Sequence, residues 1–219
     1  MGTVHWRHLL SGLYVILDPS VRPDRPLNDV LKAATAGGAR LFQYRNKMAP
    51  MKDAYIEALP LRNTARELGV LFIVNDRCDL AMAIDADGVH LGQKDLPYTD
   101  ARKLLGRNKV IGLSTHNPEQ VKAASELQPD YIGFGPIFKP GSKLDHDPVV
   151  GTEGLQQIRS LTSIPIFAIG GIGLDQVRPV MQAGANGVAV ISAALNVPDV
   201  TVAVEKLIAQ MPRPILPGS

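Results

Sequence analysis

The sequence has little of what marks a secreted or membrane-spanning protein. Cys78 is the one cysteine among 219 residues, so no internal disulfide can form, and this usage fits a reducing compartment. No uncharged apolar run approaches the roughly 20 residues that a membrane span needs. Residues 1–10 carry His5, Arg7 and His8 and lack the apolar stretch of a secretory signal. We therefore expect a cytoplasmic protein.

An excess of charge of one sign is also missing. The 23 Lys and Arg residues are nearly balanced by 21 Asp and Glu residues, which leaves a formal net charge of +2. Nucleic-acid binding needs a basic stripe with interleaved aromatic residues, and the chain has none. We expect neither nucleic acid nor a membrane as partner, so any anion must bind at a local site. The residues carry no signal for an oligomeric state.

The remaining composition is that of a globular α/β protein. Hydrophobic residues make up 45% of the chain and charged residues 20%, which excludes a chain that is disordered throughout. Short apolar runs typical of buried strands recur along the sequence at 13–17, 41–44, 71–74, 88–91, 110–113, 131–134, 166–169 and 187–191. Segments of helical character lie between them, including 27–36, 52–68, 121–127, 155–161 and 200–210.

Alternating strands and helices predict a parallel sheet with crossover helices. The strands read as buried on both faces, and the length is that of a small (β/α)8 chain, so we predict a closed TIM barrel rather than an open doubly wound sheet. No linker divides the chain, so residues 1–219 are expected to form one domain. The last nine residues, 211–219, include three prolines and should lie outside the core. In such a barrel the active face lies where the strands end.

Two cations and an amide follow the second strand. Gln43, Arg45 and Lys47 stand at alternate positions and can point the same way along an extended segment. Arg offers a bidentate fork and Lys a compact charge, which together suit a phosphate or diphosphate. Solvated charges at a strand end are the alternative interpretation.

Two carboxylates follow the next two strands. Asn75-Asp76 ends the third strand and Asp95 follows the fourth, so both aspartates should reach the same rim. Mg²⁺ takes one or two protein carboxylates and completes its shell with water and substrate phosphate oxygens. Asp76 could instead cap a helix beginning near Cys78. Asp87, at the entry to the fourth strand, belongs to the opposite rim and is expected to be a turn residue.

Polar groups also follow strands five and six. Ser114 and His116 face the rim, and His116 is either a hydrogen-bonding structural residue or a catalyst. Residues 135–151 form a long connection with almost no helical character, which suggests a lid. Within it Gly141, Ser142 and Lys143 can offer donors and charge to an anion, although a plain surface loop has the same length.

Glycine-rich or small-residue turns follow the last two strands, at 169–173 and 190–195. In TIM barrels these two loops commonly bind phosphate through backbone N–H groups and a helix N-terminus. Their presence at both places predicts a phosphorylated small-molecule substrate.

Taken together, these motifs resemble the thiamine-phosphate synthase family, whose members are single-domain TIM barrels. The ordered set runs from about residue 14 to residue 195 and comprises Gln43-x-Arg45-x-Lys47, Asn75-Asp76, Asp87-Gly-Val-His-Leu-Gly-Gln-Lys-Asp95, Gly112-Leu-Ser114, Gly133-Phe-Gly-Pro-Ile137, Ile169-Gly-Gly-Ile172 and Gly187-Val-Ala-Val-Ile-Ser192.

The resemblance implies a transferase that joins hydroxymethylpyrimidine diphosphate to thiazole phosphate, forms thiamine phosphate and releases diphosphate by a dissociative path. It implies Mg²⁺ as cofactor, held by Asp76 and Asp95, and Arg45, Lys47 and Lys143 as catalytic residues. The implied contacts of the pyrimidine diphosphate are Gln43, Tyr44, Arg45, Asn46, Lys47, Asn75, Ser114 and Lys143. The implied contacts of the thiazole phosphate are Pro140, Gly141, Ser142, Gly171, Ile191 and Ser192.

One stretch departs from the family pattern. Where the family loop commonly has Pro-Thr-x-Thr-Lys, this chain has Pro140 and Ser142 in place of the two threonines. Two rival functions remain open: a related thiazole tautomerase, which the resemblance says needs no diphosphate-and-metal cluster, and a non-catalytic binder of thiazole or thiamine phosphates.

Overall fold

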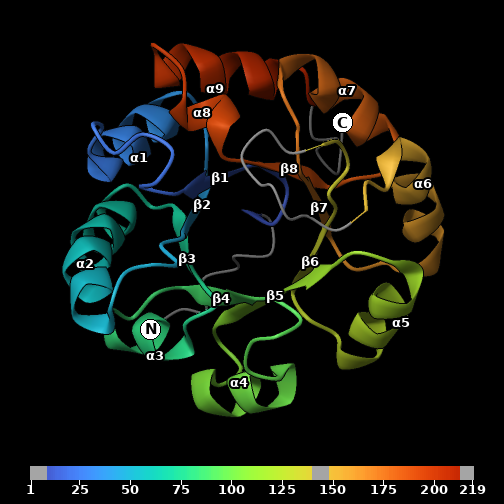
Figure 1. Ribbon diagram of the computed structural model, residues 1–219, viewed down its shortest axis with the longest axis horizontal. Helices are drawn as coiled ribbons and strands as arrows, with labels where there is room; N and C mark the ends of the chain where they lie inside the picture. The colour runs from blue at the N-terminus through green and yellow to red at the C-terminus, as the bar shows by residue number, and fades with distance from the viewer. Residues whose placement is uncertain (1–8, 140–147, 213–219) are drawn as a thin grey trace, which may run out of the picture.

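A closed barrel of eight parallel strands forms the centre of the protein (Figure 1). The computed structural model describes residues 9–139 and 148–212. Each strand pairs with its sequence neighbours, and β1 closes the ring by pairing with β8. The strands are β1 (Gly12–Leu17), β2 (Leu41–Tyr44), β3 (Leu71–Asn75), β4 (Gly88–Leu91), β5 (Val110–Thr115), β6 (Tyr131–Phe134), β7 (Ile166–Ile169) and β8 (Gly187–Val190). The predicted TIM barrel is confirmed.

Helices surround this barrel as an outer ring, as Figure 1 shows. They are α1 (Leu27–Ala36), α2 (Met51–Glu67), α3 (Cys78–Ala83), α4 (Tyr98–Leu105), α5 (Pro118–Leu127), α6 (Gly151–Leu161), α7 (Leu174–Gln182), α8 (Ser192–Leu195) and α9 (Val200–Ala209). Helix α5 begins with a side-chain cap: the Asn117 side chain accepts a hydrogen bond from the Gln120 N–H, and Pro118 takes the first helical position.

Side chains alternate along each strand between two apolar layers. On β1, Leu13, Val15 and Leu17 pack outward in the layer between strands and helices, whereas Tyr14 and Ile16 point into the barrel. This period of two decides which residues can reach a site at the barrel mouth. Two glycines make room for rings inside: a Cβ on Gly112 would lie 2.1 Å from the Tyr131 ring, and one on Gly187 would lie 2.5 Å from the Phe167 ring.

The amino-terminal rim carries three repeated contacts, which we call rim clamps. In each, the residue before an even-numbered strand accepts two hydrogen bonds. One comes from a backbone N–H of the preceding strand, and the other comes from an arginine of the helix that leads into that preceding strand. Asp87 binds the Phe72 N–H and Arg62, Asp130 binds the Ile111 N–H and Arg102, and Asn186 binds the Ile166 N–H and Arg159. Asp87 therefore does more than make a turn, because it satisfies a buried guanidinium as well.

Helix α9 is the last helix of the described chain. Met211 still packs partly against the outer core, and residues 213–219, which make up most of the proline-rich tail, lie outside the described part of the chain. Within residues 9–139 and 148–212 no helix is both long enough and apolar enough to cross a membrane.

Candidate active site

A cavity of about 790 Å³ opens at the carboxyl ends of the strands. Its described lining combines cations, carboxylates and amides above a floor of aromatic rings. The polar and charged lining residues include Gln43, Arg45, Lys47, Asn75, Asp76, His90, Gln93, Lys94, Asp95, Ser114, His116 and Gln120. They come from the ends of β2, β3, β4 and β5 and from the loops that follow, except Gln120, which lies in the first turn of α5. A cavity with an apolar floor and charged groups around it suits a small ligand that carries both a ring and a charge.

The alternation predicted for the segment after β2 is observed. Gln43, Arg45 and Lys47 all line the cavity. Arg45 forms an ion pair with Asp18, which is only 4% exposed and also accepts hydrogen bonds from the backbone N–H and the hydroxyl of Ser20. A buried carboxylate thus fixes the guanidinium in place, so Arg45 is not simply a solvated charge.

Tyr44 and Asn46 occupy the intervening positions, and their side chains do not line the cavity. The Tyr44 hydroxyl donates to Glu57 Oε2 at 2.6 Å, and the Asn46 amide donates to the same oxygen at 3.0 Å. Asn46 Oδ1 also accepts from the N–H groups of Met48 and Ala49. The structure therefore separates these two side chains from the remaining residues of this segment and anchors them to helix α2.

Asp76 and Asp95 lie side by side at the rim. Burial, together with a hydrogen bond to the adjacent Asp76 carboxyl group, raises the pKa of Asp95. Asp95 also accepts the Gly92 N–H at 2.6 Å, and Asp76 lies 3.3 Å from the Lys47 ammonium. Two carboxyl groups in contact repel each other when both are ionised, so a hard cation between them relieves the repulsion.

The alternative role for Asp76 as a helix cap is wrong. The residue that precedes α3 is Arg77, and no side chain caps that end. Asp76 has a φ of 63°, in the left-handed region that non-glycine residues seldom adopt. Such backbone conformations cluster at functional sites, where surrounding contacts hold them. Here the Asp76 N–H donates to the His90 carbonyl at 2.8 Å.

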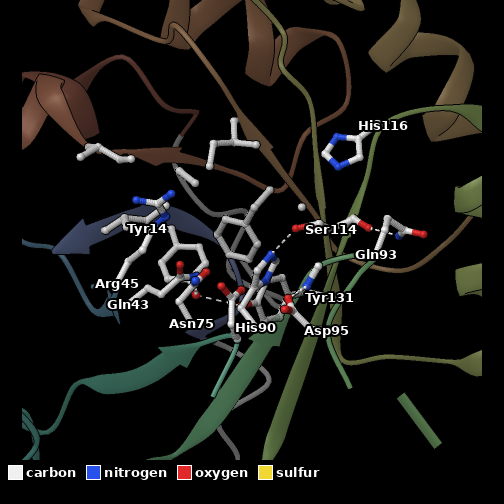
Figure 2. Close-up of a pocket in the computed structure, with 18 of the residues that line it drawn as sticks. Tyr14, Gln43, Arg45, Asn75, His90, Gln93, Asp95, Ser114, His116 and Tyr131 are labelled. Atoms are coloured by element: carbon white, nitrogen blue, oxygen red, sulfur yellow. Dashed lines mark hydrogen bonds between the residues drawn. The ribbon is translucent and has the colours of Figure 1, made fainter. Parts of the chain in front are cut away.

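A chain of hydrogen bonds crosses the bottom of the cavity, and we call it the floor chain. Gln43 Nε2 contacts the Tyr14 hydroxyl at 2.7 Å, which contacts the Tyr131 hydroxyl at 2.8 Å. The Tyr131 hydroxyl lies 3.0 Å from His90 Nδ1, and His90 Nε2 lies 2.9 Å from Ser114 Oγ. Figure 2 shows these side chains gathered together among the lining residues of the cavity.

Aromatic rings pack beneath and beside the floor chain. Tyr14, Tyr131 and Phe167 meet edge to face with ring centroids 5.2 to 5.8 Å apart, and the His90 ring stacks on Tyr131. Removal from water lowers the pKa of His90 to about 4, so the imidazole is neutral at pH 7. The sequence interpretation assigned no role to Tyr14, His90 or Tyr131. The available signal was a polar side chain at an inward position of a buried strand.

His116 lies away from the floor chain in Figure 2, although it lines the same cavity. Its Nδ1–H donates to the Gly135 carbonyl at 2.6 Å, which ties the loop after β5 to the loop after β6. This contact agrees with the structural alternative that its sequence position left open.

The long connection after β6 is closed at its base. The Val150 N–H donates to the Pro136 carbonyl at 3.0 Å, and the Gly151 N–H donates to the Ile137 carbonyl at 3.1 Å. The two ends of the segment are thus held together beside the cavity. Four residues of the predicted site, Pro140, Gly141, Ser142 and Lys143, lie outside the described residues.

The loops after β7 and β8 lie at the same end of the barrel. Ile191 lines the cavity, whereas Gly171 and Ser192 are not among its described lining residues. Gly171 has a φ of 63°, and a Cβ there would lie 2.7 Å from the Lys139 carbonyl oxygen, so this turn requires glycine. Ser192 is the first residue of the four-residue α8, in which the Ala194 and Leu195 N–H groups donate to the Ile191 carbonyl.

Comparison with known proteins agrees with this geometry. The family model described as thiamine monophosphate synthase matches residues 13–194. The chain belongs to this family. The thiamine-phosphate synthase of Chloroflexus aurantiacus is 46% identical over 204 residues, which cover 93% of this chain and 92% of that protein. The thiamine-phosphate synthase of Chlorobium phaeovibrioides is 49% identical over 180 residues, which cover 82% and 86% of the two chains.

A solved structure extends the agreement to three dimensions. The thiamine phosphate pyrophosphorylase from Pyrococcus furiosus superposes with a TM-score of 0.84 at 38% sequence identity, covering 94% of this chain and 97% of that one. The family match to residues 13–194 includes the carboxyl end of every strand that contributes to the cavity.

Proposed function

We propose that this family member is a thiamine-phosphate synthase that joins hydroxymethylpyrimidine diphosphate to thiazole phosphate and releases diphosphate. The observation that carries the proposal is the convergence, at one barrel mouth, of Arg45 and Lys47 with the carboxylate pair Asp76 and Asp95. A site that must bind a diphosphate and stabilise its departure needs both cationic side chains and a place for a divalent cation.

The carboxylate pair is suited to Mg²⁺. Asp76 and Asp95 supply two neighbouring oxygen-bearing groups, and within the described residues no third His, Cys, Asp or Glu joins them. Mg²⁺ is typically bound through one or two carboxylates plus substrate oxygens. When bound, the ion would neutralise negative charge on the diphosphate.

The chain's own cations perform the rest of the proposed electrostatic work. Arg45, oriented by Asp18, is placed to grip phosphate oxygens with its planar fork. Lys47, more exposed and beside Asp76, adds a mobile positive charge, and Lys143 is proposed to add another. As the bond to the pyrimidine methylene carbon breaks, negative charge grows on the leaving diphosphate. These groups stabilise that charge without any nucleophilic side chain.

The floor of the cavity is suited to bind the heterocycle of the substrate. The aromatic rings of Tyr14, Tyr131 and Phe167 form an apolar base for a flat ring, and Gln43 and Asn75 provide polar groups at its edge. The pyrimidine amino group can donate electrons toward the departing carbon, and the thiazole nitrogen then attacks that carbon. We assign the thiazole phosphate to backbone N–H groups near Gly171, Ile191 and Ser192.

The decisive assay mixes both substrates with Mg²⁺ and measures diphosphate and thiamine phosphate. We expect both products in equal amounts and none when either substrate is withheld. A thiazole tautomerase would interconvert thiazole isomers and release no diphosphate, and a non-catalytic binder would show saturable binding without either product. Each of these two results would overturn the proposal. We also propose a cytoplasmic location, which fractionation of expressing cells tests.

A further inference from the structure

The floor chain has one internally consistent direction. Gln43 Nε2 is an amide nitrogen and can only donate, so the Tyr14 oxygen accepts from it. The Tyr14 hydroxyl has one hydrogen of its own, and the neighbouring polar atom is the Tyr131 oxygen at 2.8 Å. Tyr14 therefore donates to Tyr131.

The same reasoning fixes the imidazole tautomer. The Tyr131 oxygen accepts from Tyr14, and its single hydrogen is left to donate to His90 Nδ1 at 3.0 Å. Nδ1 must then carry no hydrogen, which makes Nε2–H the donor to Ser114 Oγ at 2.9 Å. The low pKa that burial gives His90 agrees with a neutral ring.

This direction determines what the two ends of the floor chain offer to the cavity. Because Ser114 Oγ accepts from His90, the hydroxyl hydrogen of Ser114 remains available to donate. Because Gln43 Nε2 donates to the Tyr14 hydroxyl, the side-chain carbonyl oxygen of Gln43 remains available to accept a hydrogen bond from a ligand. Gln43 and Ser114 both line the cavity.

We propose that Tyr14, Tyr131 and His90 are positioning residues that set Gln43 as a hydrogen-bond acceptor and Ser114 as a hydrogen-bond donor. A ligand with an N–H donor on its ring and an anionic oxygen on its side chain fits these two ends. That is the chemistry of an aminopyrimidine diphosphate, and this part of the inference rests on the proposed function.

The reverse direction makes the opposite selection. If His90 carried its hydrogen on Nδ1, the hydrogens would run through Tyr131 and Tyr14 to Gln43 Oε1. Ser114 would then donate to Nε2, and Gln43 would present its NH2 group to the cavity. Such a site would prefer a ring carbonyl over a ring amino group. The tautomer of His90 therefore reports the specificity of the site.

Nitrogen-15 NMR of the full, ligand-free chain at about pH 8 reads that tautomer directly. Loss of a signal in His90→Gln assigns the ring, and His116, which donates from Nδ1 to Gly135, provides a contrasting ring in the same sample. We expect His90 to be protonated at Nε2. Protonation at Nδ1 would overturn the proposal, and the tautomer itself is read on the unmodified chain.

A variant tests the functional consequence. Tyr131→Phe keeps the ring and removes the hydroxyl, so His90 should become a mixture of tautomers, and the KM for hydroxymethylpyrimidine diphosphate should rise about tenfold. The KM for thiazole phosphate should change less than about twofold. Tyr98→Phe is the matched control, because the Tyr98 hydroxyl bonds the Gln128 carbonyl away from the cavity. It should leave the tautomer and both KM values unchanged.

The outcomes separate the two proposals. An Nε2–H tautomer without synthase turnover would support the direction of the floor chain and reject the proposed function. Turnover with an Nδ1–H tautomer would support the proposed function and reject the direction of the floor chain. A Tyr131→Phe chain with an unchanged tautomer and an unchanged diphosphate KM would overturn the positioning role.

Discussion

The two ends of the barrel use charge in opposite ways. At the amino-terminal rim, the carboxylates of Asp87 and Asp130 each accept hydrogen bonds from one arginine and one backbone N–H, so their charge is balanced by groups of the fold itself. At the carboxyl-terminal rim, Asp76 and Asp95 lie against each other, and Asp76 has an unfavourable backbone conformation. One rim is satisfied by contacts within the fold, whereas we propose that the other binds a cation and the anionic substrate. Paired charge at the amino-terminal rim thus serves the fold, and the contact of two carboxyl groups at the other rim supports the proposed metal site.

The largest effect should come from neutralising the carboxyl-terminal pair. Asp76→Asn combined with Asp95→Asn should reduce kcat/KM by roughly 1,000-fold and abolish Mg²⁺ dependence, since metal assistance is worth several kcal/mol. The thermal midpoint should not fall, because two repelling groups have been removed. Steady-state kinetics across a series of Mg²⁺ concentrations test the loss of activity, and a melting curve tests the thermal midpoint. Unchanged Mg²⁺ dependence would contradict the metal assignment.

Removing one member of a rim clamp should lower stability and leave activity unchanged. Asp87→Ala removes the carboxylate partner of the buried Arg62 guanidinium, which keeps the Asp85 carbonyl, and the acceptor of the Phe72 N–H. This should cost about 3 kcal/mol of unfolding free energy. Turnover per folded molecule should be unchanged. Urea unfolding measures the loss.

The matched control for that change is Asp24→Ala. Asp24 forms an ion pair with Arg22 and is 66% exposed, so its removal should cost far less unfolding free energy than Asp87→Ala. Equal losses for the two variants would mean that the rim clamp has no special role in stability.

A charge-preserving change at the carboxyl-terminal rim should have a moderate effect. Arg45→Lys keeps the positive charge but loses the planar fork, so kcat/KM for the pyrimidine diphosphate should fall about tenfold. Arg66→Lys, which alters an exposed ion pair with Asp85 at the other end, should leave kinetics unchanged. Wild-type kinetics in Arg45→Lys would show that charge alone is needed there.

The smallest effect concerns the floor between the two ends. Burial raises the pKa of Tyr14 and Tyr131 above the usual value, so the folded chain keeps protons that the unfolded chain loses in alkali. Stability is therefore fully present below about pH 10 and declines above it, by about 0.8 kcal/mol per tyrosine at pH 10.5. The Tyr14→Phe, Tyr131→Phe double variant should lose this part of the decline between pH 9 and 10.5, as urea unfolding at the two pH values would show. An undiminished decline would place its origin elsewhere.

The barrel and the part of the site that follows β2 could be predicted from the sequence, because both depend on local periodicity. The period of two along β2 was sufficient to place Gln43, Arg45 and Lys47 together. The same rule applied to Tyr44 and Asn46 predicts that they point away, whereas the family resemblance had grouped them with the ligand. The structure agrees with the periodicity for both side chains.

The rest depends on contacts that span large sequence separations. The Tyr14 and Tyr131 hydroxyls meet across 117 positions, and Arg45 meets Asp18 across 27. Those meetings require the ring to be closed in its actual register, which no local pattern specifies. His90 shows the same limitation, because its partners come from two other strands.

The rim clamps also bear on how the barrel assembles. Their arginine partners lie 25, 28 and 27 residues before Asp87, Asp130 and Asn186, so each clamp closes a short loop of similar size. The pairing of β1 with β8 joins residues nearly the full described length apart. Because the entropic cost of closing a loop grows with its length, we expect the three clamped units to form early and the β1–β8 seam to close last. Folding order would then follow the repeat along the chain, with the barrel becoming a ring only in its final step.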